Sequence, residues 1–395
     1  MTHQTPVDHW KVVLSACLIS SVGALMFCVS PLILGIFGNH FSLNDQQLGY
    51  LLSSFYMGFF LIATSSAFWI RRVNWRVTAL AGISITSLAL FAINDANSYQ
   101  VLLALMIAIG VGMGISYALA TQILSDSSNP DRVFGIKLTF ENLPGTALLL
   151  MLPVFVVPKF GLHGVVTVMA VTVIIFGLTI VWLPKRASKI HTFTLNSDNK
   201  ESIPVNDKNL VWYGIASIFL FALGLIVPWT FMERIGVSLM FTNGDIGLAL
   251  TACMGSSILG GLLAALIGER IGQMKPIIIG MTIYFLSLLG LGLSHNFIVY
   301  AVSCSMLLFT LNFVIAYQLG VTTTVDYSGN LVVLSASALS CAMAVGPAIG
   351  GNLIKGNDYT NLLIFSGVCG VASLGVYSFV CLRAHVKASF ETQLT

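Results

Sequence analysis

A glutamate and an asparagine lie side by side in a helical run that is otherwise mostly apolar. Glu141 and Asn142 fall within residues 132–157. Counted from Arg132 at ~1.5 Å per residue, Glu141 lies roughly 13 to 14 Å into a hydrocarbon layer about 30 Å thick. A carboxylate at that depth must take up a proton, face a wet cavity or meet a partner. We therefore expect Glu141 to carry protons and Asn142 to contact a substrate.

Lys137 offers a simpler explanation for the glutamate. It precedes Glu141 by four residues and so lies on the same face of the helix. It could neutralise Glu141 in a structural ion pair, or it could anchor an anionic substrate. Both interpretations stay open at this point.

The composition places these residues in an integral membrane protein. The chain of 395 residues is 56% hydrophobic and only 8% charged, whereas soluble proteins carry about a quarter charged residues. Uncharged runs of about 20 residues favour helices over the short alternating strands of a membrane barrel. We expect twelve spans, at residues 11–37, 47–70, 76–93, 99–122, 132–157, 161–183, 210–234, 245–268, 275–293, 297–322, 329–354 and 360–383.

The basic residues predict the orientation of these spans. With twelve spans both termini lie on one side, and 15 of the 18 Lys and Arg residues fall on that side. Only Lys159, Arg234 and Lys355 fall on the other. Because basic loops stay in the cytoplasm, both termini are expected there. The protein itself is expected in the cytoplasmic (inner) membrane of the cell. The net charge of +3 follows from this topology and does not indicate nucleic-acid binding.

The chain also carries an internal repeat. Shifts of 198 to 203 positions superpose similar residues of the two halves, including Arg71-Arg72 on Glu269-Arg270, Tyr117 on Tyr317, Asp126 on Asp326 and Pro144 on Pro347. Parallel repeats of this kind are typical of transporters. We expect an all-α membrane protein with a six-helix bundle at residues 1–183, a polar cytoplasmic linker at 184–209 and a second six-helix bundle at 210–395.

Two short motifs identify a family resemblance. Residues 265–275 read ALIGERIGQMK, and residues 346–351 read GPAIGG. Both resemble elements of the major facilitator superfamily, whose loop motif clasps the cytoplasmic ends of neighbouring helices. The resemblance implies two bundles related by a pseudo-twofold axis, which rock about a central site and open alternately to either side. It also makes Glu269 and Arg270 gating residues.

The first-half loop departs from that pattern. Arg71 stands where the acid is expected, followed by Arg72, and Asn74 stands where the glycine is expected. We expect Arg71 and Arg72 to act in gating, with the missing acid supplied by Asp126 or Asp131. The Gly-Pro element belongs in span 5 of the proton-coupled drug antiporters but lies here in span 11, which weighs against drug antiport.

Further polar residues at suitable depth are candidates for substrate binding, namely Tyr117, Asn312, Tyr317 and Gln318. Asn312 could instead make a helix–helix hydrogen bond, and the two tyrosines could belong to the membrane interface. Glu233 and Arg234 end span 7 near the external surface, where they form either an external gate or an ordinary surface ion pair.

Enzyme chemistry finds no support in the sequence. HExxH, CxxC and GK[ST] phosphate-loop motifs are all missing, and seven scattered cysteines show no metal-ligand spacing. We therefore expect no cofactor or metal. The interpretation is a monomeric secondary active transporter that moves a small organic molecule by alternating access, coupled to protons through Glu141, with efflux slightly favoured. One alternative is a proton symporter that imports a monoanionic metabolite on Lys137. The other, suggested by the departures from the motif in the first-half loop, is a membrane sensor that has kept a transporter fold.

Overall fold

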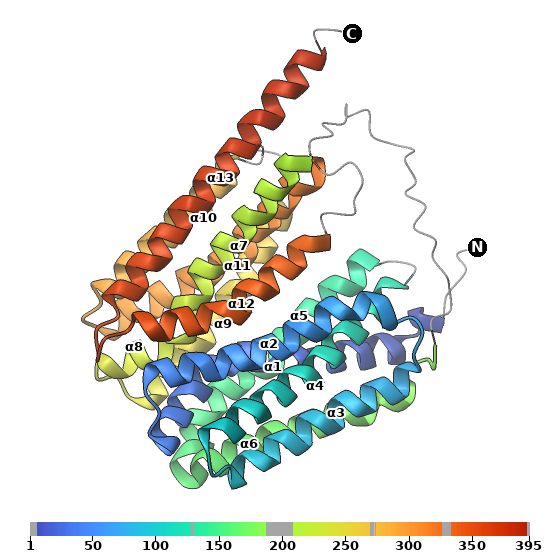
Figure 1. Cartoon of the computed structure of the whole chain (residues 1–395), viewed down its shortest axis with the longest axis vertical. Coiled ribbons are helices and arrows are strands. Elements are labelled where there is room, and N and C mark those ends of the chain that lie inside the picture. Colours follow the sequence, from blue (N-terminus) through green and yellow to red (C-terminus); the bar gives the residue numbers. More distant parts are fainter. Residues whose placement is uncertain are drawn as a thin grey trace. The chain divides into compact units, whose positions relative to one another are not determined.

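The chain folds into helices throughout the residues that the computed structural model describes, which are 6–127, 130–186, 208–268, 272, 274–325 and 333–392 (Figure 1). Twelve helices within these ranges have 18 residues or more. They are α1 (Trp10–Phe41), α2 (Asp45–Trp69), α3 (Trp75–Ala92), α4 (Tyr99–Ser125), α5 (Pro130–Met151), α6 (Val157–Gly177), α7 (Lys208–Thr230), α9 (Asn243–Ile267), α10 (Met274–Gly292), α11 (Phe297–Val325), α12 (Val333–Leu353) and α13 (Thr360–Thr392). The short helix α8 (Met232–Ser238) follows α7.

Several of these helices begin where the side chains dictate. Asn44 caps α2 by accepting from the backbone N–H of Gln47, whose side chain accepts from the backbone N–H of Asn44 in return. Ser98 caps α4 in a similar way. Such caps satisfy backbone donors that have no partner within the helix. They fix where each apolar run leaves the loop before it.

The described helices can account for twelve membrane crossings. Eleven segments in the described ranges are long and apolar enough to span a membrane, and one of them, Arg132–Trp182, has 51 residues. At ~1.5 Å per residue that segment is roughly 77 Å long, more than twice the hydrocarbon thickness. It contains α5 from Arg132 onward, a π-helical stretch at Leu152–Val156 and α6, and Gly161 breaks it with a φ of 52°. It therefore supplies two spans, as the sequence predicted.

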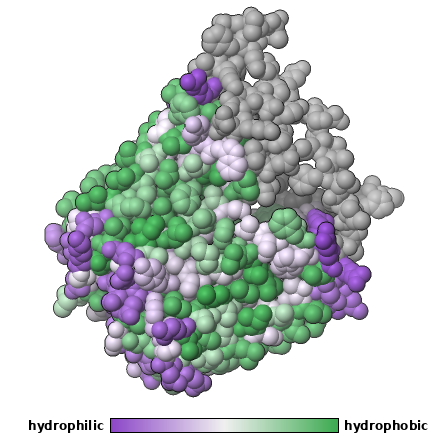
Figure 2. Space-filling model, viewed as in Figure 1, coloured by the Kyte–Doolittle hydropathy of each residue, from purple (hydrophilic) through white to green (hydrophobic). Residues whose placement is uncertain are grey.

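Apolar side chains cover the outer faces of these helices. Large exposed hydrophobic residues occur along almost every span, and Figure 2 shows hydrophobic residues along the sides of the helices with hydrophilic ones gathered toward their ends. A soluble protein rarely exposes apolar area on this scale. These faces are suited to lipid, which makes the chain a multi-pass membrane protein.

The chain divides into two compact units. The first comprises Met1–His191 with Thr242–Thr251, and the second Thr192–Phe241 with Ala252–Thr395. Helix α1 packs against α4, α5 and α6 in the first unit, and α7 packs against α11, α12 and α13 in the second. Most of the predicted linker, residues 187–207, lies outside the described part of the chain.

Matching hydrogen bonds express the internal repeat. In the first unit the hydroxyl of Ser54 on α2 donates to the carbonyl oxygen of Leu103 on α4, at 3.4 Å. In the second unit the hydroxyl of Ser256 on α9 donates to the carbonyl oxygen of Ser305 on α11, at 2.6 Å. Donor and acceptor are each displaced by 202 positions between the halves. The two units thus share a helix contact as well as a sequence pattern.

Glycines bring the same helix pairs close together. A Cβ added to Gly110 of α4 would lie 2.0 Å from the carbonyl oxygen of Phe55 on α2. A Cβ added to Gly260 of α9 would lie 2.1 Å from the carbonyl oxygen of Phe309 on α11. Lipid gives no hydrophobic drive for helix association, so close backbone packing of this kind carries much of the stability.

Candidate functional site

Glu141 lies inside the first unit and is held by Lys137. The Lys137 Nζ atom is 2.6 Å from Glu141 Oε1, and the side chains are only 3% and 7% exposed. The two residues are four positions apart on α5, the spacing that places them on one helical face. The ion pair that the sequence allowed is therefore present, and it is buried. A buried pair is tolerated only when further contacts satisfy its polar atoms.

A serine from α1 supplies one such contact. The hydroxyl of Ser20, which is fully buried, donates to Glu141 Oε1, the same oxygen that binds Lys137. Sequence reasoning missed this residue. A serine within an apolar run was the available signal, but the pattern along α1 does not say which helix the serine faces.

Small residues allow α1 and α5 to approach closely at this point. A Cβ added to Gly145 would lie 2.3 Å from the Cβ of Cys28 on α1. Ser21, beside Ser20, donates to the backbone carbonyl of Phe140 at 2.7 Å. Two adjacent serines of α1, Ser20 and Ser21, thus bind two adjacent residues of α5, Glu141 and Phe140. This register brings Ser20 to the carboxylate.

An aromatic ring from α4 lies against the ammonium group. Lys137 Nζ is 4.2 Å from the ring centroid of Tyr117, and 5.8 Å from that of Phe134 on its own helix. A cation over a desolvated ring gains about 2 kcal/mol. The structure therefore gathers three of the sequence-predicted residues, Lys137, Glu141 and Tyr117, into one cluster. We call Ser20, Tyr117, Lys137 and Glu141 the α5 charge cluster.

The second carboxylate oxygen is placed differently from the first. Among the residues that the structure describes, no donor hydrogen-bonds to Glu141 Oε2, and Oε2 is not one of the fully buried unsatisfied oxygens. A proton can add to Oε2 without displacing Ser20 or Lys137 from Oε1. The cluster is neutral as it stands, and protonation of Glu141 would leave the ammonium charge without its counter-charge.

Asn142 does not join this cluster. Its side-chain amide donates to the backbone carbonyl of Leu138 on the same helix, at 2.9 Å, and the residue is partly exposed. Neighbouring positions on a helix point about 100° apart, so Glu141 and Asn142 face different surroundings.

The second-half candidates contact neighbouring helices of the second unit. Asn312 donates to the hydroxyl of Ser257 at 2.8 Å and to its carbonyl at 3.1 Å. The hydroxyl of Tyr317 reaches the carbonyl of Ala264 at 3.4 Å. The two Asn312 bonds are helix–helix hydrogen bonds, which the sequence allowed as the alternative to substrate binding.

Gln318 belongs to a buried hydrogen-bond network between three helices of this unit. Its amide donates to the hydroxyls of Ser217 on α7 and Ser373 on α13, each at 3.0 Å. Ser373 in turn donates to the carbonyl of Ser217 at 2.8 Å. These contacts tie α7, α11 and α13 together, as polar side chains in membrane bundles commonly do.

The first-half loop forms a clasp with an acid from α4. Arg71 is 3.1 Å from Asp126 Oδ1, and the side chains are 41% and 2% exposed. Gln122 donates to the same oxygen at 3.1 Å. Of the two acids expected to pair with this loop, Asp126 thus binds Arg71 in the structure. Arg72 is exposed.

The other predicted gating residues are partly visible. Glu269 and Arg270, like Asp131's side chain, lie outside the described residues. Glu233 is buried in the first turn of α8, and Arg234 is half-buried beside it. The hydroxyl of Tyr300 donates to the carbonyl of Met232 at 2.8 Å and fixes the start of this helix.

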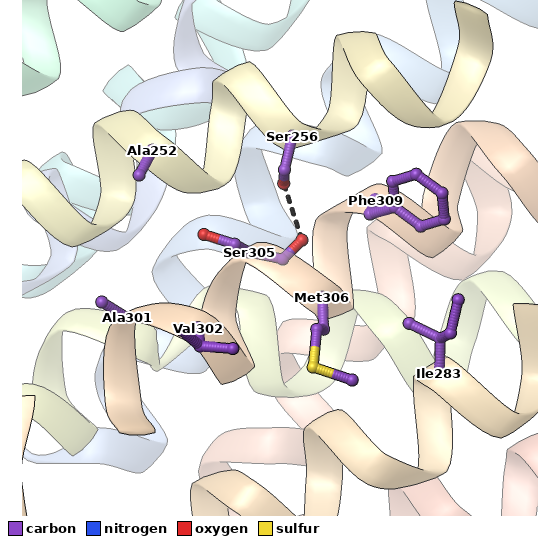
Figure 3. Close-up of a pocket in the computed structure, with 8 residues that line it drawn as sticks. All are labelled: Ala252, Ser256, Ile283, Ala301, Val302, Ser305, Met306 and Phe309. Atoms are coloured by element: carbon purple, nitrogen blue, oxygen red, sulfur yellow. Dashed lines mark hydrogen bonds between the residues drawn. The ribbon is translucent and has the colours of Figure 1, made fainter. Parts of the chain in front are cut away.

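A separate hollow of about 500 Å³ lies in the second unit between α9, α10 and α11 (Figure 3). Its lining is apolar apart from two serines, and the Ser256 hydroxyl is turned to the Ser305 carbonyl. None of the sequence-predicted site residues lines it. The hollow is open, and it lies among helices whose outer faces are exposed and apolar.

Comparison with known proteins places this helical architecture. Residues 15–328 match the family model of the Major Facilitator Superfamily. The uncharacterized MFS-type transporter YceJ of Bacillus subtilis (strain 168) is 20% identical over 383 residues, which cover 94% of this chain and 97% of that protein.

Solved structures show the same fold. A bacterial homologue of the human lysosomal transporter Spinster, inward-facing and occupied, has a TM-score of 0.67 at 15% identity, with 96% of each chain covered. The nucleoside transporter NupG has a TM-score of 0.69 at 12% identity, with 93% of this chain and 98% of NupG covered. The expected fold and transporter class are confirmed, and the protein is a secondary transporter and not an enzyme. By the match over most of its length, the chain belongs to the Major Facilitator Superfamily.

Proposed function

We propose that this transporter couples the movement of a small organic molecule to a proton carried by Glu141. The observation that supports the proposal is the α5 charge cluster, in which a carboxylate lies deep in an apolar span with one oxygen held and the other without a donor. A carboxylic acid at such depth is favoured in its neutral form unless an opposite charge is near. Its charge state therefore depends on Lys137.

The coupling would work through the ion pair. When Glu141 takes a proton on Oε2, the charge–charge attraction that holds Lys137 Nζ at 2.6 Å is lost. The ammonium then keeps its contacts with the neutral carboxyl group and with the rings of Tyr117 and Phe134, but a buried charge without an opposite charge is costly. A change in hydration or in substrate binding would relieve that cost. Alternating exposure of the cluster to the two sides would then move the proton across the membrane.

The charge balance limits the cargo. The cluster contains one ammonium and one carboxylate, so a multiply charged anion would lack counter-charge. A neutral, weakly cationic or lipophilic molecule fits this balance, and efflux in exchange for a proton is the direction we favour. The transporter would act as a monomer in the cytoplasmic membrane with both termini in the cytoplasm, in agreement with the distribution of its basic residues.

Lys137 supports a second candidate, the symport of a monoanion with a proton. If one proton binds to Glu141 and one monoanion binds to the released ammonium, the cluster stays neutral overall. The nearby Tyr117 ring, 4.2 Å from the ammonium, would form one wall of such a site. Lys137→Met should abolish binding of a monoanion, whereas binding of a neutral or cationic cargo should persist.

Transport assays with oriented proteoliposomes test both candidates. A substrate is first found by its thermal stabilisation of the purified protein, since a ligand of the folded form raises apparent stability. An imposed pH gradient should then drive accumulation by the wild type and not by Glu141→Gln, which should keep gradient-free exchange. An inward proton gradient drives the cargo out in antiport and in with symport. Gradient-driven accumulation by Glu141→Gln at the wild-type level would show that the pair is only structural.

A further inference from the structure

Two adjacent serines of α1 both reach α5, but they bind chemically different acceptors. The Ser21 hydroxyl donates to a backbone carbonyl, that of Phe140, at 2.7 Å. The Ser20 hydroxyl donates to the Glu141 carboxylate. Both serines are fully buried. A backbone carbonyl is neutral at every pH, whereas a carboxylate loses its negative charge when it binds a proton. Of the two serines, only Ser20 therefore contacts a group whose charge can change.

We infer that Ser20 is a positioning residue that orients Glu141 and sets the pH at which this carboxylate takes up its proton. The inference rests on the proposed role of Glu141 in proton coupling. A hydroxyl that donates to a carboxylate favours the ionised form over the neutral one. It does so without adding a charge to the cluster, unlike Lys137.

The other groups that face Glu141 do not replace this contact. Lys137 on the same helix supplies the opposite charge, and Tyr117 of α4 contacts Lys137 through its ring. From α1, the thiols of Cys17 and Cys28 lie near the carboxylate, and the Cys28 Sγ atom is 3.9 Å from the Glu141 backbone carbonyl. Among the described residues, Ser20 is thus the uncharged hydrogen-bond donor to the carboxylate.

The position of Ser20 gives the two carboxylate oxygens of Glu141 different contacts. Ser20 and Lys137 both bind Oε1, and no described donor hydrogen-bonds to Oε2, so we assign the proton to Oε2. Because a protonated carboxyl group still accepts a hydrogen bond, the Ser20 contact survives when the Lys137 attraction is lost. Ser20 would therefore keep α1 and α5 joined in both charge states.

Removal of the hydroxyl should make the proton bind more tightly. A hydrogen bond to a charged group is worth enough to shift a titration by about one pH unit or more, which corresponds to roughly tenfold in proton affinity. Ser20→Ala should therefore move the titration midpoint of Glu141 to higher pH. Ser20→Cys, close in size and a weak donor, should move it in the same direction, and Ser20→Thr should keep the wild-type midpoint.

Ser21→Ala is the matched control. It removes a buried hydroxyl from the same helix and breaks a bond to the same partner helix, but that bond ends on the Phe140 backbone. It should lower thermal stability without moving the Glu141 midpoint. A shift seen with Ser20 variants and not with Ser21→Ala therefore reports on the carboxylate and not on loosened packing.

Infrared difference spectroscopy on the full chain in lipid nanodiscs measures this midpoint directly, with the proton itself as the probe. The C=O stretch of the protonated carboxyl group is followed as the pH is stepped, and the component that disappears in Glu141→Gln is assigned to Glu141. The inference predicts an upward shift for Ser20→Ala and Ser20→Cys, with Ser20→Thr and Ser21→Ala unchanged. Equal midpoints in the wild type and both Ser20→Ala and Ser20→Cys would overturn the inference alone. If no titrating component disappears in Glu141→Gln, the proposed coupling role of Glu141 fails as well.

Discussion

Neutralising one member of the Lys137–Glu141 pair should destabilise the protein far more than neutralising both. Glu141→Gln leaves the ammonium of Lys137 buried, with a side-chain exposure of 3%. Breaking a buried ion pair from one side costs about 3–5 kcal/mol. The Tyr117 ring at 4.2 Å contacts the ammonium before and after the change, so its contribution cancels in the difference. A loss of about 3–5 kcal/mol is therefore expected.

Lys137→Met has a different pH dependence. The buried carboxylate that it leaves behind can take a proton, and the neutral acid is far cheaper to bury than the ion. The variant should therefore be nearly as stable as the wild type at low pH and should lose stability as the pH rises. The double variant Lys137→Met/Glu141→Gln contains no buried charge in the cluster, and it should be more stable at neutral pH than the sum of the single losses implies.

Reversible unfolding in mixed detergent micelles provides the measurement, with the four proteins compared in a double-mutant cycle. We expect an interaction free energy of about 2 kcal/mol between positions 137 and 141 at neutral pH. Additive losses, with an interaction near zero, would refute the claim that the two charges depend on each other. Such a result would also remove the basis for coupling through the pair.

Three further predictions concern contacts outside this cluster, in both units. Gly110→Ala should weaken α2–α4 packing and lower the thermal stability markedly, because the new Cβ would lie 2.0 Å from a backbone carbonyl oxygen. Gly255→Ala is the control for the same melting assay, and it should be neutral because the space around Gly255 is open. Asn312→Ala should cost about 1 kcal/mol through its lost bonds to Ser257 and leave the substrate KM unchanged; a raised KM would make it a substrate ligand instead. Asp126→Asn should release the first-half clasp and raise the reactivity of a cysteine placed in the loop at 71–74, and unchanged reactivity would contradict a clasp.

Local pattern was enough to predict the membrane class and the helices, and to mark the charged pair as one of two possibilities. Lys137 and Glu141 meet because residues four apart share one face of a helix, a relation fixed within α5 itself. The boundary between the fifth and sixth spans also follows from local chemistry, since Gly161 can adopt the positive φ found there. Family membership was visible in short motifs and is confirmed over most of the chain.

Contacts between distant helices were beyond reach of the same reasoning. Ser20 lies 121 positions from Glu141, and its meeting with the carboxylate depends on how α1 is rotated against α5. Depth along a span suggested Asn142, Asn312 and Gln318 alike as substrate-binding residues. Depth does not give the direction of a side chain, and the structure places these three in different local environments.

The first-half loop shows how one contact changes an interpretation. The missing acid in this loop suggested a degraded clasp and, from it, a sensor that no longer transports. In the structure Arg71 binds Asp126, which comes from the end of α4. The observation that motivated the sensor hypothesis therefore carries less weight, and the transporter class stands on the family match.

Proton movement during transport tests the central claim most directly. Purified protein is reconstituted into liposomes that contain a trapped pH-sensitive dye, and substrate is added without any imposed gradient. The wild type should change the internal pH as substrate moves, and Glu141→Gln should move substrate with no change in internal pH. Substrate movement accompanied by the same pH change in both proteins would show that the proton travels elsewhere.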